Sequence, residues 1–114
     1  MKRGTIVLIN ASFSDLSATK IRPALVISNE GYNIKQDDVV LILMSSNISR
    51  STPDDYVLED SNPEFKTTGL IRSSTFRTGK IITLKKDLLR NTLGFVGPNT
   101  LNQIEKRLRK LLPL

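Results

Sequence analysis

A continuous apolar run at residues 39–44 restricts the possible folds more than any other feature of this 114-residue chain. It is the longest apolar stretch, and its six residues are far fewer than the ~20 that a helix needs to cross a bilayer. A short run that is apolar at every position is typical of a strand buried on both faces. Because the N-terminal apolar stretch is also too short for a signal-peptide core, we expect a soluble, cytoplasmic protein.

Short β-branched and aromatic runs surround this central strand. We predict strands at residues 5–9, 23–28, 38–44, 56–59 and 93–97, and one or two more from residues 68–72 and 74–77. Pro23 is expected at the start of its strand, residues 29–33 are expected to form a turn, and Thr83 is expected to cap one or two helical turns at 85–90.

An amphipathic helix is predicted to close the chain from Asn99. Its apolar residues recur at spacings of three, four, three and one: Leu101, Ile104, Leu108, Leu111 and Leu112. Short strands at close spacing followed by one helix predict a mainly β (α+β) fold, a small curled sheet or barrel, in a single domain over residues 1–114.

Composition excludes several kinds of chemistry. The chain has no Cys and no His, so it cannot form disulfides, and only oxygen donors remain for a metal, which disfavours zinc and iron sites. No side chain has an unperturbed pKa near 7, so an enzyme of this sequence must use another group or electrostatic stabilisation. We expect no cofactor and no metal.

The positive charge is concentrated in the last third of the chain. From Arg77 onward there are nine basic and two acidic residues, a balance of +7, whereas the first 76 residues carry −1. Acidic residues cluster between positions 54 and 64. This asymmetry favours a polyanionic or acidic partner, although a solvated basic helix without such a role has the same composition.

Three stretches, taken together, resemble the MazF/PemK family of toxin endoribonucleases. The most specific is residues 15–28, in which Arg22 and Pro23 begin a strand, and the second is the sequence MSSN at residues 44–47. The third is a spaced set in the second half: Gly69, Leu70, Ser74, Arg77, Lys80, Ile81, Thr83, Leu84 and Leu88.

The resemblance implies an SH3-like β-barrel with short helices, a homodimer, metal-independent and sequence-selective cleavage of single-stranded RNA, and inhibition by a cognate antitoxin with an acidic segment. It also implies that Arg22 and Ser45 are the catalytic pair, with Ser45 in place of a threonine. RNA cleavage through attack of the ribose 2′-OH needs stabilisation of charge on phosphorus, which a planar, permanently charged guanidinium provides. A serine hydroxyl can bind a phosphate oxygen but cannot be the base unaided.

Other polar residues are candidates for RNA binding. We assign this role to Ser46, Asn47, Arg72, Ser74, Arg77 and Lys80. Asn47 or Tyr32 is placed to contact a splayed base. Alternatively, Arg72 and Arg77 pair with the acidic cluster at 54–64.

The sequence departs from the family pattern at three further places. Ser17 and Ala18 stand where many members have Glu-Gln, an acidic residue found in another branch is absent at Ser74, and Gly79 stands where several members have Asp. The general base is unassigned. A second hypothesis is therefore a degenerate member that binds RNA or an acidic, antitoxin-like peptide without cleavage. A third, by analogy of fold alone, is interference with a protein target such as a topoisomerase.

Overall fold

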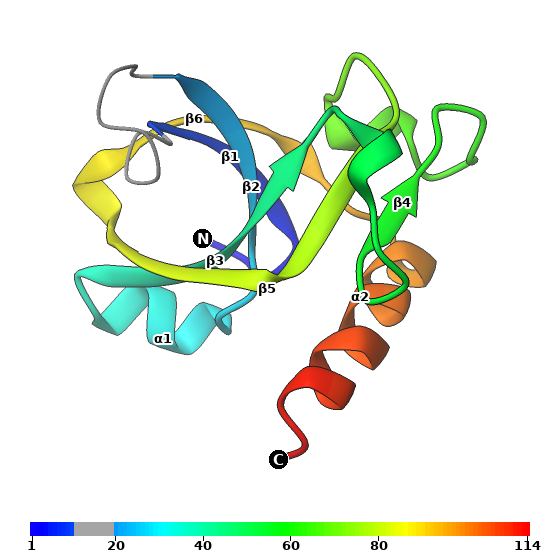
Figure 1. The fold of residues 1–114 in the computed structure, drawn as a ribbon. Coiled ribbons are helices and arrows are strands. Elements are labelled where there is room, and N and C mark those ends of the chain that lie inside the picture. Colours follow the sequence, from blue (N-terminus) through cyan, green and yellow to red (C-terminus); the bar gives the residue numbers. More distant parts are fainter. Residues whose placement is uncertain (11–19) are drawn as a thin grey trace.

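The computed structural model describes residues 1–10 and 20–114, and the described chain is mainly β (Figure 1). The elements follow in this order: β1 (Thr5–Asn10), β2 (Ile21–Val26), α1 (Glu30–Lys35), β3 (Asp38–Ser45), β4 (Tyr56–Leu58), β5 (Ser74–Lys85), β6 (Leu89–Phe95) and α2 (Pro98–Leu111). Short 3₁₀ turns lie at Ile48–Arg50, Lys66–Thr68 and Lys86–Leu88. No helix in these residues is long and apolar enough to span a membrane.

The strands form one antiparallel sheet in the order β4-β5-β3-β2-β1-β6. The sheet curls strongly, with β5 along one side of the curl and β6 along the opposite side (Figure 1). Over the described residues, β4 and β6 each pair with a single neighbour, so the sheet is curled into a barrel-like shape without hydrogen-bonded closure. The mainly β fold and the closing helix are confirmed.

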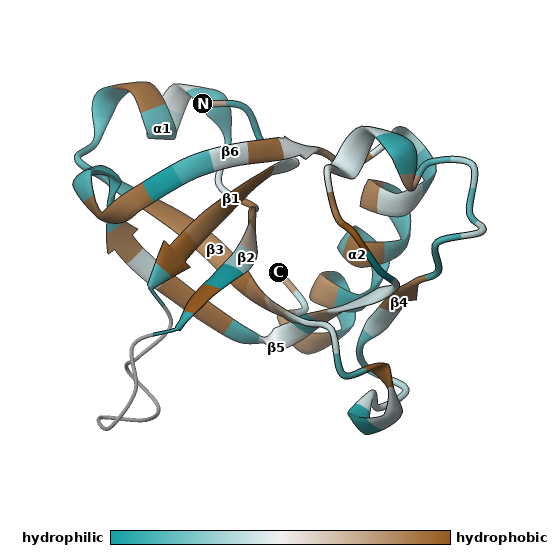
Figure 2. Ribbon diagram, turned by 90° about the horizontal axis from the view of Figure 1, so that it is seen from above, coloured by the Kyte–Doolittle hydropathy of each residue, from teal (hydrophilic) through white to brown (hydrophobic). Residues whose placement is uncertain are grey.

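The central strand β3 is buried on both faces, as its sequence predicts. Val39 and Leu41 pack in one apolar cluster, and Ile42 and Met44 pack in another on the opposite face. The second of these clusters also receives Ile104 of α2, which packs against β4 and β5. Figure 2 shows β1 and β3 as largely hydrophobic ribbons in the middle of the sheet.

Four local predictions are wrong. Residues 66–73 form a 3₁₀ turn and bends rather than a strand, with Gly69 in the left-handed region at φ 74°. Residues 29–33 are not a simple turn, because Asn29 accepts the N–H of Tyr32 and caps α1. Thr83 lies within β5, so it caps no helix. Pro23 is the third residue of β2 rather than its first.

β5 contains a bulge that the sequence does not predict. Ile42 of β3 pairs with Ile81, but the next residue, Leu43, pairs with Arg77. Thr78, Gly79 and Lys80 are therefore extra residues in β5 with no partner position in β3. A Cβ atom at Gly79 would meet nothing within 4 Å, so this segment leaves open space around its tip.

The N-terminus of α2 is capped by a residue from a distant loop. Glu64 accepts the N–H of Asn99 at 3.1 Å and both the N–H and the hydroxyl of Thr100 at 2.7 Å. Gly97 permits this approach, since a Cβ there would lie 2.4 Å from Cδ of Glu64. Partial burial disfavours the charged carboxylate, but these hydrogen bonds outweigh that effect and hold the pKa of Glu64 below its ordinary value.

Glu64→Gln should destabilise the protein by about 1–2 kcal/mol at pH 7, because the helix N-terminus loses an anionic acceptor. A carboxyl group whose pKa is lowered by folding stabilises the protein above its unfolded pKa, ~4.3 for glutamate. That contribution disappears as the pH falls from there through the lower pKa of the folded state. Urea unfolding at pH 7 and pH 3 checks this: the variant should differ from wild type at pH 7 and much less at pH 3. The exposed Glu59→Gln is the control, and equal losses in both variants would contradict the assigned role of Glu64.

Candidate functional site

Arg22 and Ser45 lie where two neighbouring strands separate. β2 and β3 pair over only three positions, from Ala24 opposite Leu43 to Val26 opposite Leu41. Beyond Ala24, β2 continues its pairing with β1, with Arg22 opposite Ile9. Beyond Leu43, β3 continues its pairing with β5. β2 and β3 therefore begin to diverge after the Ala24–Leu43 pair. The two candidate catalytic residues lie just beyond this point, one on each strand.

Pro23 explains why the strands separate at this point. Ile27 donates its N–H to Val40 of β3 at 2.9 Å. Because hydrogen-bonding directions alternate along a strand, residue 23 also has its backbone nitrogen on the side of β3. Proline has no N–H to donate there, so the ladder between β2 and β3 ends before Pro23. The Arg-Pro pair thus contributes to the site through the backbone as well as through the guanidinium.

The side chains of Arg22 and Ser45 project from the same face of the sheet. Ala24 and Leu43 are directly opposite each other, and side chains two residues apart on a strand share a face. Arg22 is two residues before Ala24, and Ser45 is two residues after Leu43. Both are half-buried, so the structure brings a guanidinium and a hydroxyl to the two sides of the divergence.

The hydroxyl of Ser45 is held by the turn that follows it. Its Oγ accepts the N–H of Asn47 at 3.1 Å, and it can still donate its own proton. This bond orients the hydroxyl in the absence of the methyl group that restricts a threonine. Asn47 accepts a hydrogen bond from Ser49 at 2.6 Å, and Ser46 and Asn47 are both exposed.

Thr75 is a neighbour of the site that the sequence does not reveal. It lies directly opposite Ser45 in β5 and is 2% exposed. Its Oγ1 is hydrogen-bonded to the hydroxyl of Ser51 at 2.6 Å, and Ser51 also donates to the carbonyl of Ile48 at 2.7 Å. These bonds fasten the turn after Ser45 to β5. Only the strand register identifies Thr75, because the residue is otherwise an ordinary strand threonine.

Arg77 extends the same face, and together with Lys80 it lines a cavity beside the bulge of β5. Arg77 lies opposite Leu43, two residues from Thr75. The cavity has a volume of about 430 Å³. Its charged lining residues are Arg77, Lys80, Arg107, Lys110, Asp54 and Asp55. Arg107 and Lys110 come from α2 and were not among the predicted site residues.

Other candidates are placed elsewhere. Ser74 is 3% exposed and donates to the carbonyl of Arg72 at 2.9 Å. It lies opposite Leu58, on the face away from Thr75 and Arg77. Arg72 is exposed in the segment before β5. The structure therefore does not bring Ser74 to the face that carries Arg22 and Ser45.

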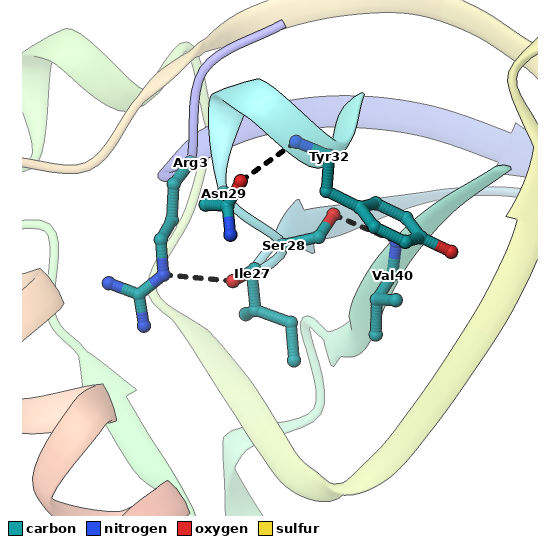
Figure 3. Close-up of a pocket in the computed structure, with 6 residues that line it drawn as sticks. All are labelled: Arg3, Ile27, Ser28, Asn29, Tyr32 and Val40. Carbon is teal, nitrogen blue, oxygen red and sulfur yellow. Dashed lines mark hydrogen bonds between the residues drawn. The ribbon is translucent and has the colours of Figure 1, made fainter. Parts of the chain in front are cut away.

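Tyr32 is also remote from the pair. It lines a separate hollow with Arg3, Ser28 and Val40, shown in Figure 3. In this hollow Ser28 accepts the N–H of Val40 and Arg3 donates to the carbonyl of Ile27. Ser28 follows the last residue of β2, whereas Arg22 is near its start. The two sites are thus at opposite ends of this strand.

The acidic residues at 54–64 do not neutralise the candidate arginines. Over residues 1–10 and 20–114, the one ion pair joins Arg3 to Glu105. The alternative in which Arg72 and Arg77 pair with the acidic cluster is therefore not what these residues do. Ser17 and Ala18 lie outside the described residues.

Comparison with known proteins identifies related folds and a family. Residues 2–112 match the family described as PemK-like, MazF-like toxin of type II toxin–antitoxin system. A mycobacterial endoribonuclease in complex with its cognate antitoxin is 26% identical, with a TM-score of 0.78 over 100% of this chain and 96% of that chain. A second mycobacterial endoribonuclease is 28% identical, with a TM-score of 0.74 over 100% and 92%.

A more distant structure shares the fold. The MazE–MazF structure from Deinococcus radiodurans is 20% identical, with a TM-score of 0.75 over 100% of this chain and 96% of that chain. A sequence search among curated proteins finds no match.

Proposed function

The chain belongs to the PemK-like, MazF-like toxin family of type II toxin–antitoxin systems, and from this premise we propose that it is a metal-independent, sequence-selective endoribonuclease that cleaves single-stranded RNA. The observation that carries the proposal is the placement of Arg22 and Ser45 on one face, at the point where β2 and β3 diverge. The two mycobacterial relatives are endoribonucleases by name, which supports the same activity in this chain.

The proposed reaction uses the 2′-OH of the RNA as its nucleophile. The 2′-oxygen forms a bond to the adjacent phosphorus, and the bond from phosphorus to the 5′-oxygen breaks. The 2′-OH loses its proton and the departing 5′-oxygen gains one, which leaves a 2′,3′-cyclic phosphate and a 5′-OH. Negative charge increases on the phosphate oxygens in the transition state, and catalysis consists largely of stabilising that charge.

Arg22 and Ser45 match this requirement. Arg22 presents a positive charge and a planar fork of donors to the non-bridging oxygens. The Ser45 hydroxyl donates a hydrogen bond to a phosphate oxygen while its own oxygen accepts the N–H of Asn47. Ser46 and Asn47, which are exposed beside this pair, contact the neighbouring nucleotides, and Arg72, Arg77 and Lys80 add positive charge along the strand.

The proposal extends to partners. We infer a homodimer and a cognate antitoxin whose acidic, partly disordered segment folds onto the RNA-binding face. The mycobacterial relative that was solved with its antitoxin supports such a partner. Co-expression with the acidic protein encoded beside the toxin should relieve growth arrest, and sedimentation of the purified toxin should give twice the chain mass.

The decisive experiment incubates purified protein with an unstructured RNA in excess chelator. We expect cleavage at a small set of sequences, mapped by 5′-end sequencing, and products with 2′,3′-cyclic phosphate ends. A matched RNA with a single 2′-deoxy nucleotide 5′ of the cleaved bond should resist cleavage at that position. Activity that needs added metal ions would contradict metal independence. Intact RNA together with tight, salt-dependent binding would instead establish a binding protein that does not cleave.

A further inference from the structure

We propose that the basic hollow, the cavity lined by Arg77, Lys80, Arg107 and Lys110, binds a backbone phosphate of the RNA that flanks the cleaved one. This inference rests on the proposed function and adds a subsite to it. It also gives the end of α2 a role in RNA binding.

Arg107 is oriented in advance for an anion. Its Nε donates to the carbonyl of Asp55 at 3.0 Å, and its Nη1 donates to the backbone and side-chain oxygens of Gln103 at 3.0 and 3.1 Å. The guanidinium carbon lies 5.1 Å from the ring centroid of Tyr56. These contacts fix the plane of the guanidinium, and none of them uses Nη2. A guanidinium held in this way loses little conformational entropy when it binds a phosphate.

One of the two acidic residues of the hollow, Asp55, has its carboxylate engaged in its own turn, and the backbone of the other, Asp54, is bonded to the bulge of β5. The carboxylate of Asp55 accepts the N–H and the hydroxyl of Thr52 at 3.1 and 3.3 Å. The carbonyl of Asp54 accepts the hydroxyl of Thr78 at 2.8 Å. Neither residue forms an ion pair with the four basic side chains in the described part of the chain. Four cations and two anions leave an excess positive charge, which favours a phosphate.

Arg77 links the hollow to the candidate catalytic face. It lines the hollow, and it is two residues along β5 from Thr75, which lies opposite Ser45. Two strand residues span about 7 Å. An RNA strand whose cleaved phosphate lies between Arg22 and Ser45 therefore has the hollow within reach of its flanking nucleotides.

The open space at the tip of the β5 bulge gives the RNA strand room to enter the hollow. A Cβ atom at Gly79 would have no neighbour within 4 Å, and Lys80 beside it is exposed. Lys110 follows Arg107 by three residues, so the two basic side chains lie on one side of α2. The hollow thus receives basic side chains from β5 on one wall and from α2 on the other.

The test compares Lys110→Ala with Lys106→Ala, which removes the same charge from an exposed position of α2 that does not line the hollow. Binding is measured with the 2′-deoxy RNA, which is not cleaved, over a range of salt concentrations. We expect Lys110→Ala to weaken binding about five- to tenfold at 0.15 M salt and to reduce the slope of log K against log salt by about 0.7, the value for one phosphate on a single strand. Lys80→Ala should do the same, and Lys106→Ala should match wild type.

RNA length and the antitoxin complete the test. With an RNA too short to reach the hollow, wild type and Lys110→Ala should bind equally. Equal salt slopes for Lys110→Ala and Lys106→Ala on the long RNA would overturn the subsite, even if wild type cleaves RNA normally. A loss of antitoxin binding without loss of RNA binding would also overturn it and assign the hollow to the acidic partner. Absence of both RNA binding and cleavage by wild type would instead remove the proposed function and the subsite together.

Discussion

Arg22→Ala should abolish RNA cleavage, lowering kcat/KM by about 10³-fold or more. The loss combines a charge and a planar set of donors aimed at the transition state, and removal of a single donor from such a site already costs about 10²–10³-fold. Arg22→Lys keeps the charge but not the fork, so it should recover only a small part of the activity. Initial rates on a fluorogenic single-stranded RNA that contains the mapped cleavage sequence measure both variants.

Arg90→Ala is the matched control for Arg22. Arg90 is an exposed arginine on β6 and carries no assigned role, so its loss should leave the rate within about twofold of wild type. Thermal unfolding of each variant separates a catalytic loss from a folding defect, because Arg22 lies opposite the buried Ile9. Wild-type rates in a folded Arg22→Ala protein would remove Arg22 from the mechanism.

Ser45→Ala should lower kcat by about 10²-fold with a smaller change in KM, because the hydroxyl donates to charge that develops in the transition state. Ser45→Thr should keep the activity or raise it, since the added methyl restricts the same hydroxyl that the N–H of Asn47 already orients. Single-turnover rates with saturating protein report the chemical step directly.

Ser61→Ala, at an exposed serine before Glu64, removes a hydroxyl that has no assigned role and should have no effect. The three serine variants therefore separate the hydroxyl from the methyl and from the general effect of substitution. If Ser45→Ala and Ser61→Ala cleave at equal rates, the hydroxyl of Ser45 takes no part in catalysis.

Periodicity predicts the parts of this fold that depend on burial alone. The run at residues 39–44 reveals β3 and its two buried faces, and the stripe from Leu101 to Leu112 reveals α2. Both signals come from which residues avoid water. The cap of α1 and the 3₁₀ turn before Gly69 depend on hydrogen bonds and backbone angles, which hydrophobic periodicity does not record. For the same reason periodicity does not predict that β5 is one strand interrupted by a three-residue bulge.

The residues of the candidate site also differ in whether the sequence or only the structure identifies them. Arg22 and Ser45 are identified from sequence because they stand in a specific pattern, and the structure then places them on one face. Ser74 has the right residue type, but the pairing with Leu58 turns it to the other face. Thr75, Arg107 and Lys110 reach the site through strand register and the packing of α2. No property of these three residues taken singly distinguishes them from other threonines, arginines and lysines of the chain.

The bulge of β5 offers a position for a spectroscopic probe. The chain contains no cysteine, so Gly79→Cys would give a protein with a single thiol, and the open space at that position accommodates a small fluorophore. Labelling would then be uniform without removal of any native residue. The fluorescence of a dye at this position would report the binding of RNA or of the antitoxin in real time. The rates of the two fluorescence changes would show which of them the toxin binds first.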